Sequence, residues 1–404
     1  MKRMTLDEWE KKYIVNHVKR FDPKYTMFSR NTWDPEIKDL LEDWSVAGTP
    51  KAKAGYDLEA LALRWGSNVG TQMGLFDEFK PDVKNRAVAA AIAPTNSGRR
   101  SRAYAPPAGV HVNASDVDRI TLIVKKVAKW FGADLVGICK LDRRWLYTPT
   151  LTDDGPAPFG LHQEIPDEYQ YAIVTAYEMD YDLTKYFNTH TANAAAKMGY
   201  SRIAVTNAHL SAFIRHLGFR SIESGNAIGL SIPMAIQAGL GELGRNGLLL
   251  TPKFGPRQRI SMVITDLPLL VDAPIEFGVT EFCMSCKKCA DKCPSQSIMS
   301  GNRTTEANNK SNNPGVLKWP LNAETCRTHW GRTSAGCVTC IAVCPYNKPY
   351  TWFHRTVRWL TDHARWADNI YVKMDALFGY GKPKKADKFW EEWKPHNGYG
   401  SNQL

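Results

Sequence analysis

Four cysteines fall within eleven residues in the stretch Cys283-Met-Ser-Cys286-Lys-Lys-Cys289-Ala-Asp-Lys-Cys293-Pro294. A second set follows, in which ten residues separate Cys326 from Cys337-Val-Thr-Cys340-Ile-Ala-Val-Cys344-Pro345. The spacing C-x2-C-x2-C-x3-C-P is the one with which bacterial two-cluster ferredoxins hold 4Fe-4S cubanes. The sequence therefore predicts a module with two 4Fe-4S clusters.

In such modules the fourth cysteine of each set ligates the cluster of the other set. We therefore assign one cluster to Cys283, Cys286, Cys289 and Cys344, and the other to Cys293, Cys326, Cys337 and Cys340. Structural zinc sites also use C-x2-C pairs, but they do not require two C-P endings. A disulfide framework is typical of small secreted chains rather than of a chain with 404 residues. The ninth cysteine, Cys139, is predicted to be an inert buried thiol.

The chain length and the net charge exclude few classes of protein. A chain of 404 residues is long enough for two or more domains. The formal net charge of +11 permits a nucleic-acid or anionic-membrane partner without requiring one. No apolar run reaches the roughly 18 residues that cross a bilayer. Residues 1–10 are charged and lack the apolar centre of a signal peptide.

The sequence patterns predict four regions. Residues 1–114 are rich in aromatic side chains, and residues 94–109 have the composition of a linker or of an ordered surface excursion. We expect an α+β core over residues 115–277, the ferredoxin-like module over 278–350, and a C-terminal segment over 351–404 that packs back on the core.

Hydrophobic periodicity predicts the main elements of the core. A helix should follow an N-cap at Ser115 and end at Gly132, and a long helix should span Thr191–Leu217. Further helical patterns occur at 6–18, 56–65 and within 228–240, and buried strands are expected at 135–139, 171–177 and 257–265.

Six glycines occur within the 24 residues from Ser224 to Gly247. Glycine at this density allows the backbone to approach a large flat ligand and to offer it free N–H groups. The alternative interpretation is a series of tight turns around a packed helix.

Several motifs closely resemble those of the reductive dehalogenases, corrinoid and iron–sulfur enzymes of anaerobic, organohalide-respiring bacteria. These motifs are Gly199-Tyr200-Ser201, Glu223-Ser224-Gly225-Asn226, Gly241-Glu242-Leu243-Gly244-Arg245-Asn246-Gly247, Gly255-Pro256-Arg257-Gln258-Arg259 and both cysteine sets. The resemblance covers roughly residues 115–349. It implies a nitroreductase-like cobalamin-binding core into which the two-cluster ferredoxin module is inserted, an α+β fold.

The resemblance also implies a base-off cobalamin seated between the core and the module. No Asp-x-His-x-x-Gly corrinoid-ligand pattern occurs in the sequence, which agrees with a cobalt that has no protein histidine ligand. The predicted contacts to this cofactor come from the glycine-rich stretch: Gly225, Gly229, Gly241, Gly244, Arg245, Asn246 and Gly247.

By position, the tyrosine, asparagine and arginine of the family's active site fall on Tyr200, Asn226 and Arg259. Reductive cleavage of a carbon–halogen bond needs two electrons, a proton and stabilisation of the leaving halide. A tyrosine has an unperturbed pKa of about 10 and can keep its proton until the reaction requires it. A nearby guanidinium favours the phenolate that remains. Arg257, two residues before Arg259, is the alternative arginine.

Aromatic walls are expected around an apolar halocarbon, and Trp330 and Phe28 are the candidates for the substrate pocket. Ordinary core packing is the alternative for both. The family that this chain resembles includes compact members that act on chlorinated one- and two-carbon alkanes, such as chloroform or trichloroethane. Because the N-terminal region is compact here, the resemblance implies such substrates over chloroethenes.

The resemblance further implies export by the twin-arginine route to the outer face of the cytoplasmic membrane. We therefore expect this chain, which lacks that signal, to be the mature form. Its predicted partners are a small organohalide, a quinol-linked or reduced-carrier electron donor and a small integral membrane anchor protein. No nucleic-acid partner is expected, and a homodimer is considered as the oligomeric state.

Two competing functions follow from the same residues. The chain also resembles the cobalamin-dependent epoxyqueuosine reductases, which act on transfer RNA, but it has no helical-repeat extension after the clusters. An electron-transfer subunit with two clusters and no corrinoid would leave the glycine-rich stretch without a purpose.

Overall fold

The computed structural model describes residues 1–15, 17–38, 50–72, 111–149 and 164–393. A four-stranded antiparallel sheet in the order β2-β3-β7-β4 forms the centre of the core. Its strands are β2 (Leu135–Lys140), β3 (Tyr171–Glu178), β7 (Gln258–Thr265) and β4 (Ser221–Ser224). The predicted linker at 94–109 lies outside the described residues. The three strands predicted from sequence are confirmed to within about one residue.

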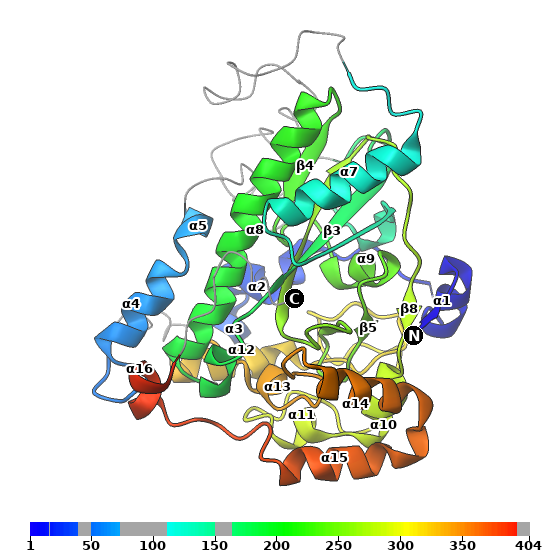
Figure 1. Cartoon of the computed structure of the whole chain (residues 1–404). Coiled ribbons are helices and arrows are strands. Elements are labelled where there is room, and N and C mark those ends of the chain that lie inside the picture. The colour runs from blue at the N-terminus through cyan, green and yellow to red at the C-terminus, as the bar shows by residue number, and fades with distance from the viewer. Residues whose placement is uncertain (16, 39–49, 73–110, 150–163, 394–404) are drawn as a thin grey trace.

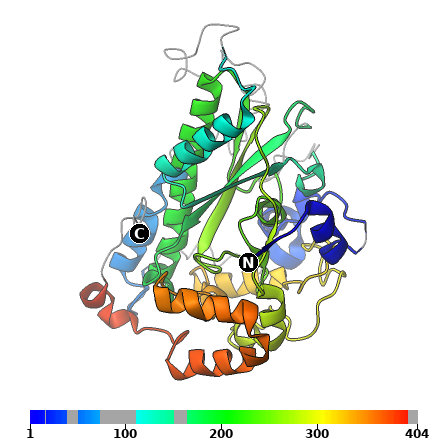
Figure 2. The same cartoon turned by 45° about the vertical axis from the view of Figure 1, so that its right-hand side comes forward.

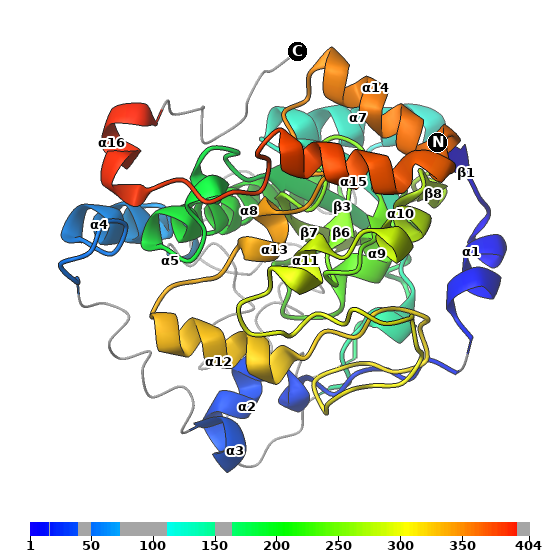
Figure 3. The ribbon, with the colours of Figure 1, turned by 90° about the horizontal axis from the view of Figure 1, so that it is seen from below.

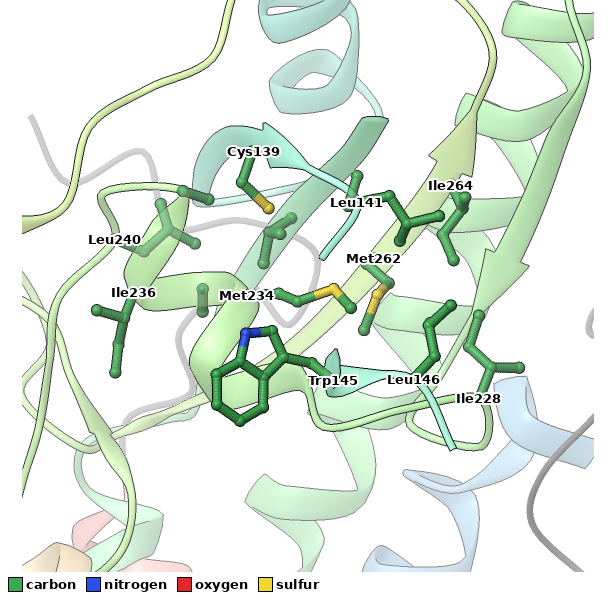
Figure 4. Close-up of a cluster of buried hydrophobic side chains, with 14 of the residues drawn as sticks. Cys139, Leu141, Trp145, Leu146, Ile228, Met234, Ile236, Leu240, Met262 and Ile264 are labelled. Carbon is green, nitrogen blue, oxygen red and sulfur yellow. The ribbon is translucent and has the colours of Figure 1, made fainter. Parts of the chain in front are cut away.

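Helices cover both faces of this sheet (Figure 1). On one face, Ile173 and Val263 pack against α7 (Val117–Trp130) and α8 (His190–His216). On the other face, Val174 and Met262 pack against α9 (Ser231–Gln237), as the close-up in Figure 4 shows around Met234 and Trp145. Neighbouring residues of one strand face opposite sides of the sheet because side chains alternate with a period of two along a strand.

Local signals account for the ends of the long helices. The Thr189 hydroxyl accepts a hydrogen bond from Ala192 N at the start of α8, and Gly218 follows its end with φ +92°. The N-cap of α7 is Asp116, whose side chain accepts from Arg119 N, and not the predicted Ser115. That prediction was wrong because Asp116, one residue later, offers an equally good capping side chain.

Two very short sheets complete the core. Strand β1 (Lys2–Arg3) pairs with β8 (Ile275–Glu276), and β5 (Glu242–Leu243) pairs with β6 (Leu249–Leu250). The second pair encloses the loop from Gly244 to Leu248. Strand β5 contacts α10 (Val279–Ser285) of the cluster module, and the N-terminus, where β1 begins, pairs with Asp362 of α14 (Trp352–His363); Figure 2 shows this terminus beside the orange helix.

The cluster module lies beyond one end of the sheet, and the view from below in Figure 3 brings it forward. Its helices are α10 (Val279–Ser285), α11 (Lys288–Asp291), α12 (Ala323–Thr333) and α13 (Thr339–Ala342). Cys326 lies on α12, which returns the chain to the other cysteines after the long excursion from residue 294 to 322.

The C-terminal segment packs mainly on the module. It consists of α14 (Trp352–His363), η6 (Arg365–Ala367), α15 (Asp368–Leu377), η7 (Ala386–Lys388) and α16 (Phe389–Glu392). Tyr371 of α15 packs against the cluster that contains Phe282 and Cys283, whereas Phe389 contacts Tyr186 of the core at 5.1 Å between ring centres. Arg358 of α14 also donates to the core carbonyl oxygens of Pro252 and Lys253, so the segment contacts both the module and the core, and the division into four regions stays a prediction. The apolar side of α15 instead shields the cluster cysteines.

The N-terminal region wraps around both parts. Its elements are α1 (Leu6–Tyr13), η1 (Pro23–Tyr25), α2 (Met27–Trp33), α3 (Pro35–Lys38), α4 (Leu58–Gly66) and α5 (Val69–Gln72), and the remaining turns of the core are η4 (Arg143–Trp145) and η5 (Leu183–Tyr186). Helices α4 and α5 lie along α8, and the buried Arg30 of α2 pairs with Glu324 of α12 at 2.6 Å. No helix in the described ranges has the length and apolar character needed to cross a bilayer.

Candidate active site between the core and the cluster module

A cavity of about 440 Å³ lies where the sheet core meets the cluster module. The core supplies Tyr200, Asn226 and Arg259 to its wall, and the module supplies residues 311–313 and 318–321. Much of the remaining wall is apolar and includes Trp9, Trp145, Leu230, Ile236, Leu243 and Leu249. A mostly apolar hollow with a few polar groups is the usual form of a small-molecule or cofactor site.

The three predicted catalytic residues come together here from separate elements. Tyr200 lies in the middle of α8, Arg259 lies near the start of β7, and Asn226 follows β4. The guanidinium carbon of Arg259 lies 5.3 Å from the centre of the Tyr200 ring. Ser231 Oγ donates to Asn226 Oδ1 at 2.6 Å, which fixes the orientation of the amide. The arrangement puts a phenol, a cation and an amide at one cavity.

Glycine at position 199 makes the contact between Tyr200 and Arg259 sterically possible. A Cβ at Gly199 would lie 2.7 Å from Arg259 Cγ, closer than real carbon atoms approach. The motif Gly199-Tyr200 therefore serves the packing of the arginine against α8.

Arg257 lies elsewhere. It is 1% exposed, its Nε donates to Asn347 Oδ1 at 2.9 Å, and its Nη1 donates to Glu178 Oε1 and to Met179 O. It does not line the cavity. The geometry thus favours Arg259 over Arg257 as the arginine beside Tyr200.

The glycine-rich stretch only partly lines the cavity. Gly229 and Gly247 belong to the wall, and Gly247 adopts φ +71°. A Cβ at Gly229 would lie 2.6 Å from Trp145 O, and one at Gly241 would lie 2.0 Å from Leu250 O. Most of these glycines are thus required for close packing of turns, which was the alternative interpretation.

Five of the predicted cofactor contacts are absent from the wall: Gly225, Gly241, Gly244, Arg245 and Asn246. The buried Arg245 donates to the carbonyl oxygens of Cys283, Met299 and Gly301. Asn246 Oδ1 accepts from Leu248 N at 3.2 Å and shapes the loop between β5 and β6. Their contact with a cofactor stays a prediction; in this geometry Arg245 joins the core to the module.

Several buried polar atoms of cavity residues have no hydrogen-bond partner within the described part of the chain. They are Trp145 Nε1, Glu242 Oε2, Arg259 Nε, Asn312 Oδ1 and Asn313 Nδ2. Buried polar groups are normally satisfied, so such atoms around one hollow indicate a ligand with its own donors and acceptors.

Glu242 is the most unusual of these groups. It is 4% exposed, and its Oε1 accepts from Phe277 N at 2.5 Å and from Val279 N at 3.3 Å. Burial raises the pKa of Glu242 to about 7 despite these bonds. The carboxyl is therefore partly protonated near neutrality and can donate from Oε2.

The module cysteines act on one another electrostatically across the two sets, while the assignment of ligands to each cluster stays a prediction. Burial is the main cause that raises the pKa of Cys283, and the charges of Cys344, Cys289 and Cys286 add to it. Burial likewise raises the pKa of Cys326 to about 12, with contributions from Cys337 and Cys293. Cys283 and Cys326 thus each have the fourth cysteine of the other set among their charged neighbours, and such thiolates need a positive iron centre nearby.

The sulfur atoms of the module are not arranged as a disulfide framework. All nine cysteines are free, and Cys139 is a buried thiol as predicted. In the described ranges, no group of three or more His, Cys, Asp or Glu side chains has the geometry to hold a single metal ion.

Residues 282–347 match the family model described as 4Fe-4S double cluster binding domain. The described segment therefore carries sites for two 4Fe-4S clusters. Over 302 residues the chain is 35% identical to the tetrachloroethene reductive dehalogenase of Sulfurospirillum multivorans, covering 69% of this chain and 60% of that protein. It is 37% identical over 318 residues to the tetrachloroethene reductive dehalogenase of Desulfitobacterium hafniense, covering 70% and 57%. The chain belongs to the reductive dehalogenase family.

The fold agrees with this family. The solved structure of the catabolic reductive dehalogenase NpRdhA matches with a TM-score of 0.72 at 23% identity, over 100% of this chain and 52% of that chain. The predicted α+β fold with its two-cluster module is thereby confirmed. The chain spans about 60% or less of the length of these reductive dehalogenases.

The two predicted pocket aromatics do not line this cavity. Phe28 of α2 is 47% exposed, and the Arg327 guanidinium lies over both Phe28 and Trp330, at 5.3 and 5.8 Å from the ring centres. The structure brings the two rings to one arginine on α12. Their role in substrate binding stays a prediction.

The sequence interpretation missed several wall residues, including Trp145, Glu242, Lys318 and Trp319. Glu242 lies inside a quoted motif of the reductive dehalogenases, so its carboxyl within that motif was the one available signal. The other three stand in segments without periodicity, and only the tertiary fold brings them to the cavity.

Proposed function

We propose that this chain is a corrinoid-dependent reductive dehalogenase acting on small organohalides. One observation carries the proposal: Tyr200, Asn226 and Arg259 line a single cavity whose opposite wall belongs to the two-cluster module. The family of the chain supports the same function. A solved reductive dehalogenase with this fold, whose structure suggests a mechanism for B12-dependent dehalogenation, supports the choice of cofactor.

The residues present fit a corrinoid. The cavity has a mostly apolar wall and several unpartnered polar atoms among its lining residues, which suits a macrocycle with an amide fringe. Gly229, Gly247 and the indole of Trp145 would form one side, and residues 318–321 the other. When bound, a reduced corrinoid supplies the low-potential cobalt centre that accepts cluster electrons and passes them to the carbon–halogen bond.

The protein residues then have defined roles. The overall change, R–X plus two electrons and one proton to R–H plus X⁻, needs one proton donor at the carbon. Tyr200 Oη would donate that proton, and the Arg259 guanidinium would stabilise the phenolate left behind. Asn226, held by Ser231, would orient the phenol or the halogen through its amide.

The substrate is proposed to be a chlorinated hydrocarbon with one or two carbons. The sequence interpretation favoured chloroalkanes, whereas relatives at 35% and 37% identity are named for tetrachloroethene. Both classes should therefore be assayed side by side. Export to the outer face of the cytoplasmic membrane, a small membrane anchor protein and a quinol-linked or carrier-linked donor remain proposals from the family resemblance.

Substitution of Tyr200 tests the proposal. Tyr200→Phe should retain iron and corrinoid but lose about 10²- to 10⁴-fold in dechlorination rate, measured as chloride release with a chemical reductant. Tyr171→Phe, on β3 and away from the cavity, is the matched control and should keep its activity. A fully active Tyr200→Phe variant would remove the tyrosine from the mechanism.

The alternative function, reduction of epoxyqueuosine in transfer RNA, has one observation in its favour. An epoxyqueuosine reductase of Lactococcus garvieae is 28% identical over 134 residues, which cover 30% of this chain. Retention of transfer RNA by the protein, weakening steeply with added salt, would favour that function over dehalogenation.

A further inference from the structure

The side chain of Lys318 lines the cavity. Its Nζ donates to the Asn313 carbonyl oxygen at 2.6 Å, which occupies one of the three donors of an ammonium group. Within the described ranges no acidic side chain offsets its charge, and burial alone lowers the pKa of Lys318 to about 8. A partly buried cation left in this way is unfavourable unless a ligand compensates it.

Hydrogen bonds hold the wall segment that carries Lys318 in place. The side chain of Asn308 donates to Pro320 O at 3.0 Å, and that of Asn312 donates to Leu321 O at 3.0 Å. On the other side, Val316 pairs with Ile14 and Lys318 pairs with Thr304 through backbone bridges. These bonds hold residues 308–321 against the cavity without using the side chain of Asn313.

Asn313 adds a second donor beside the lysine. Its side chain lines the cavity, is 8% exposed, and has an Nδ2 with no partner in the described part of the chain. The neighbouring Asn312 Oδ1 is an acceptor that also lacks a partner among the described residues. A cation, an amide donor and a nearby acceptor together fit an anionic oxygen group that stands next to a hydroxyl or amide.

Two carboxyls of the cavity do not compete for this cation. Glu276 pairs with Lys12 at 2.5 Å and accepts from Tyr13 Oη at 3.2 Å. The charges that act on Glu242 are those of Glu276 and Glu281, not that of Lys318.

We propose that Lys318 and Asn313 bind the phosphodiester of the nucleotide tail of the corrinoid. The inference rests on the proposed function. The side chains around a cobalamin ring are neutral amides, and the phosphodiester of the tail is the anionic group available to offset a lysine. Placing it at Lys318 directs the tail along the wall that the module supplies.

Corrinoids with and without the tail test this subsite. Protein with both clusters reconstituted and no corrinoid would be titrated with hydroxocobalamin and with cobinamide, which lacks the phosphodiester and nucleotide. The unmodified protein should bind cobalamin roughly 10- to 100-fold more tightly, as expected for hydrogen bonds to a charged group. Lys318→Met should remove most of this preference by weakening cobalamin alone, and Lys318→Arg should retain it.

Lys126→Met, an exposed lysine on α7, is the control and should change neither affinity. Equal affinities of the unmodified protein for cobalamin and cobinamide would overturn the inference. It would also be overturned if Lys318→Met lowered the affinities for the two corrinoids equally. Binding of inorganic phosphate without any preference between the corrinoids would also overturn it. The preference of the unmodified protein needs no variant, so a poorly folded Lys318→Met does not prevent the test. If neither corrinoid binds, the proposed function itself fails.

Discussion

Substitution of the two neighbouring arginines, Arg257 and Arg259, should affect different properties of the protein. Arg257 is buried and bonded to Glu178, Met179 O and Asn347. Arg259 is half-buried, lines the cavity and has an Nε without a partner in the described ranges. We therefore expect Arg257→Gln to lower stability and Arg259→Gln to lower turnover.

The magnitudes follow from these contacts. Removing one partner of a buried ion pair costs about 3–5 kcal/mol. The Glu178 side chain is 21% exposed, so water can solvate the carboxylate that remains, and we expect a loss near the lower end, about 3 kcal/mol. Among the described residues, the contact that Arg259→Gln loses is the cation–π contact to Tyr200, worth about 0.5–1 kcal/mol. The loss of the arginine from the reacting centre should instead cost about 10²- to 10³-fold in kcat.

Anaerobic urea unfolding and dechlorination kinetics would measure both effects on cofactor-loaded protein. Arg257→Gln should unfold at lower urea and, where folded, keep its kcat within a few-fold. Arg259→Gln should unfold close to the unmodified protein and retain its iron and corrinoid. The reasoning is refuted if Arg257→Gln abolishes turnover at unchanged stability while Arg259→Gln remains active.

Two further predictions concern the wall and the module. The pKa of Glu242 in the folded state, about 7, lies above its usual value of 4.5, so the unfolded chain loses this proton at lower pH and the folded state loses stability as pH rises between those values. The free energy of unfolding of Glu242→Gln should therefore rise by up to about 3 kcal/mol relative to that of the unmodified protein between pH 5 and pH 8. Unfolding of corrinoid-free protein would measure this difference. A pH-independent difference would contradict this. Cys293→Ser should damage the cluster held by Cys326, whereas Cys344→Ser should damage the one held by Cys283, as followed by iron content and by electron paramagnetic resonance of each reduced variant. Loss of the opposite cluster in either variant would reverse the assignment.

The core could be predicted from sequence because its elements carry strong local patterns. Strands β3 and β7 contain the apolar runs 172–174 and 262–264, and α8 has a start signal at Thr189 and a stop at Gly218. The two-residue strands β5 and β6 have no period to detect. They form because Arg245 and Glu242 fix the loop between core and module through hydrogen bonds to distant backbone atoms.

The candidate site was predictable only through motifs. Tyr200, Asn226 and Arg259 stand on a helix, a loop and a strand, and each would be an ordinary residue of its element if considered alone. Their meeting at one cavity depends on the pairing of β7 with β3 and β4 and on the glycine at 199. Gly241 and Gly244 show why glycine content alone does not locate a cofactor contact, because close packing against Leu250 requires the same residue that ligand approach would.

Quantitation of metals in the intact protein tests the central claim most directly. Protein purified anaerobically from cells supplied with corrinoid should contain one cobalt and about eight irons per chain, with the absorption bands of both cofactors, since two 4Fe-4S clusters hold four irons each. Full iron occupancy without cobalt would contradict a corrinoid site in the cavity and the roles given to Tyr200, Asn226 and Arg259.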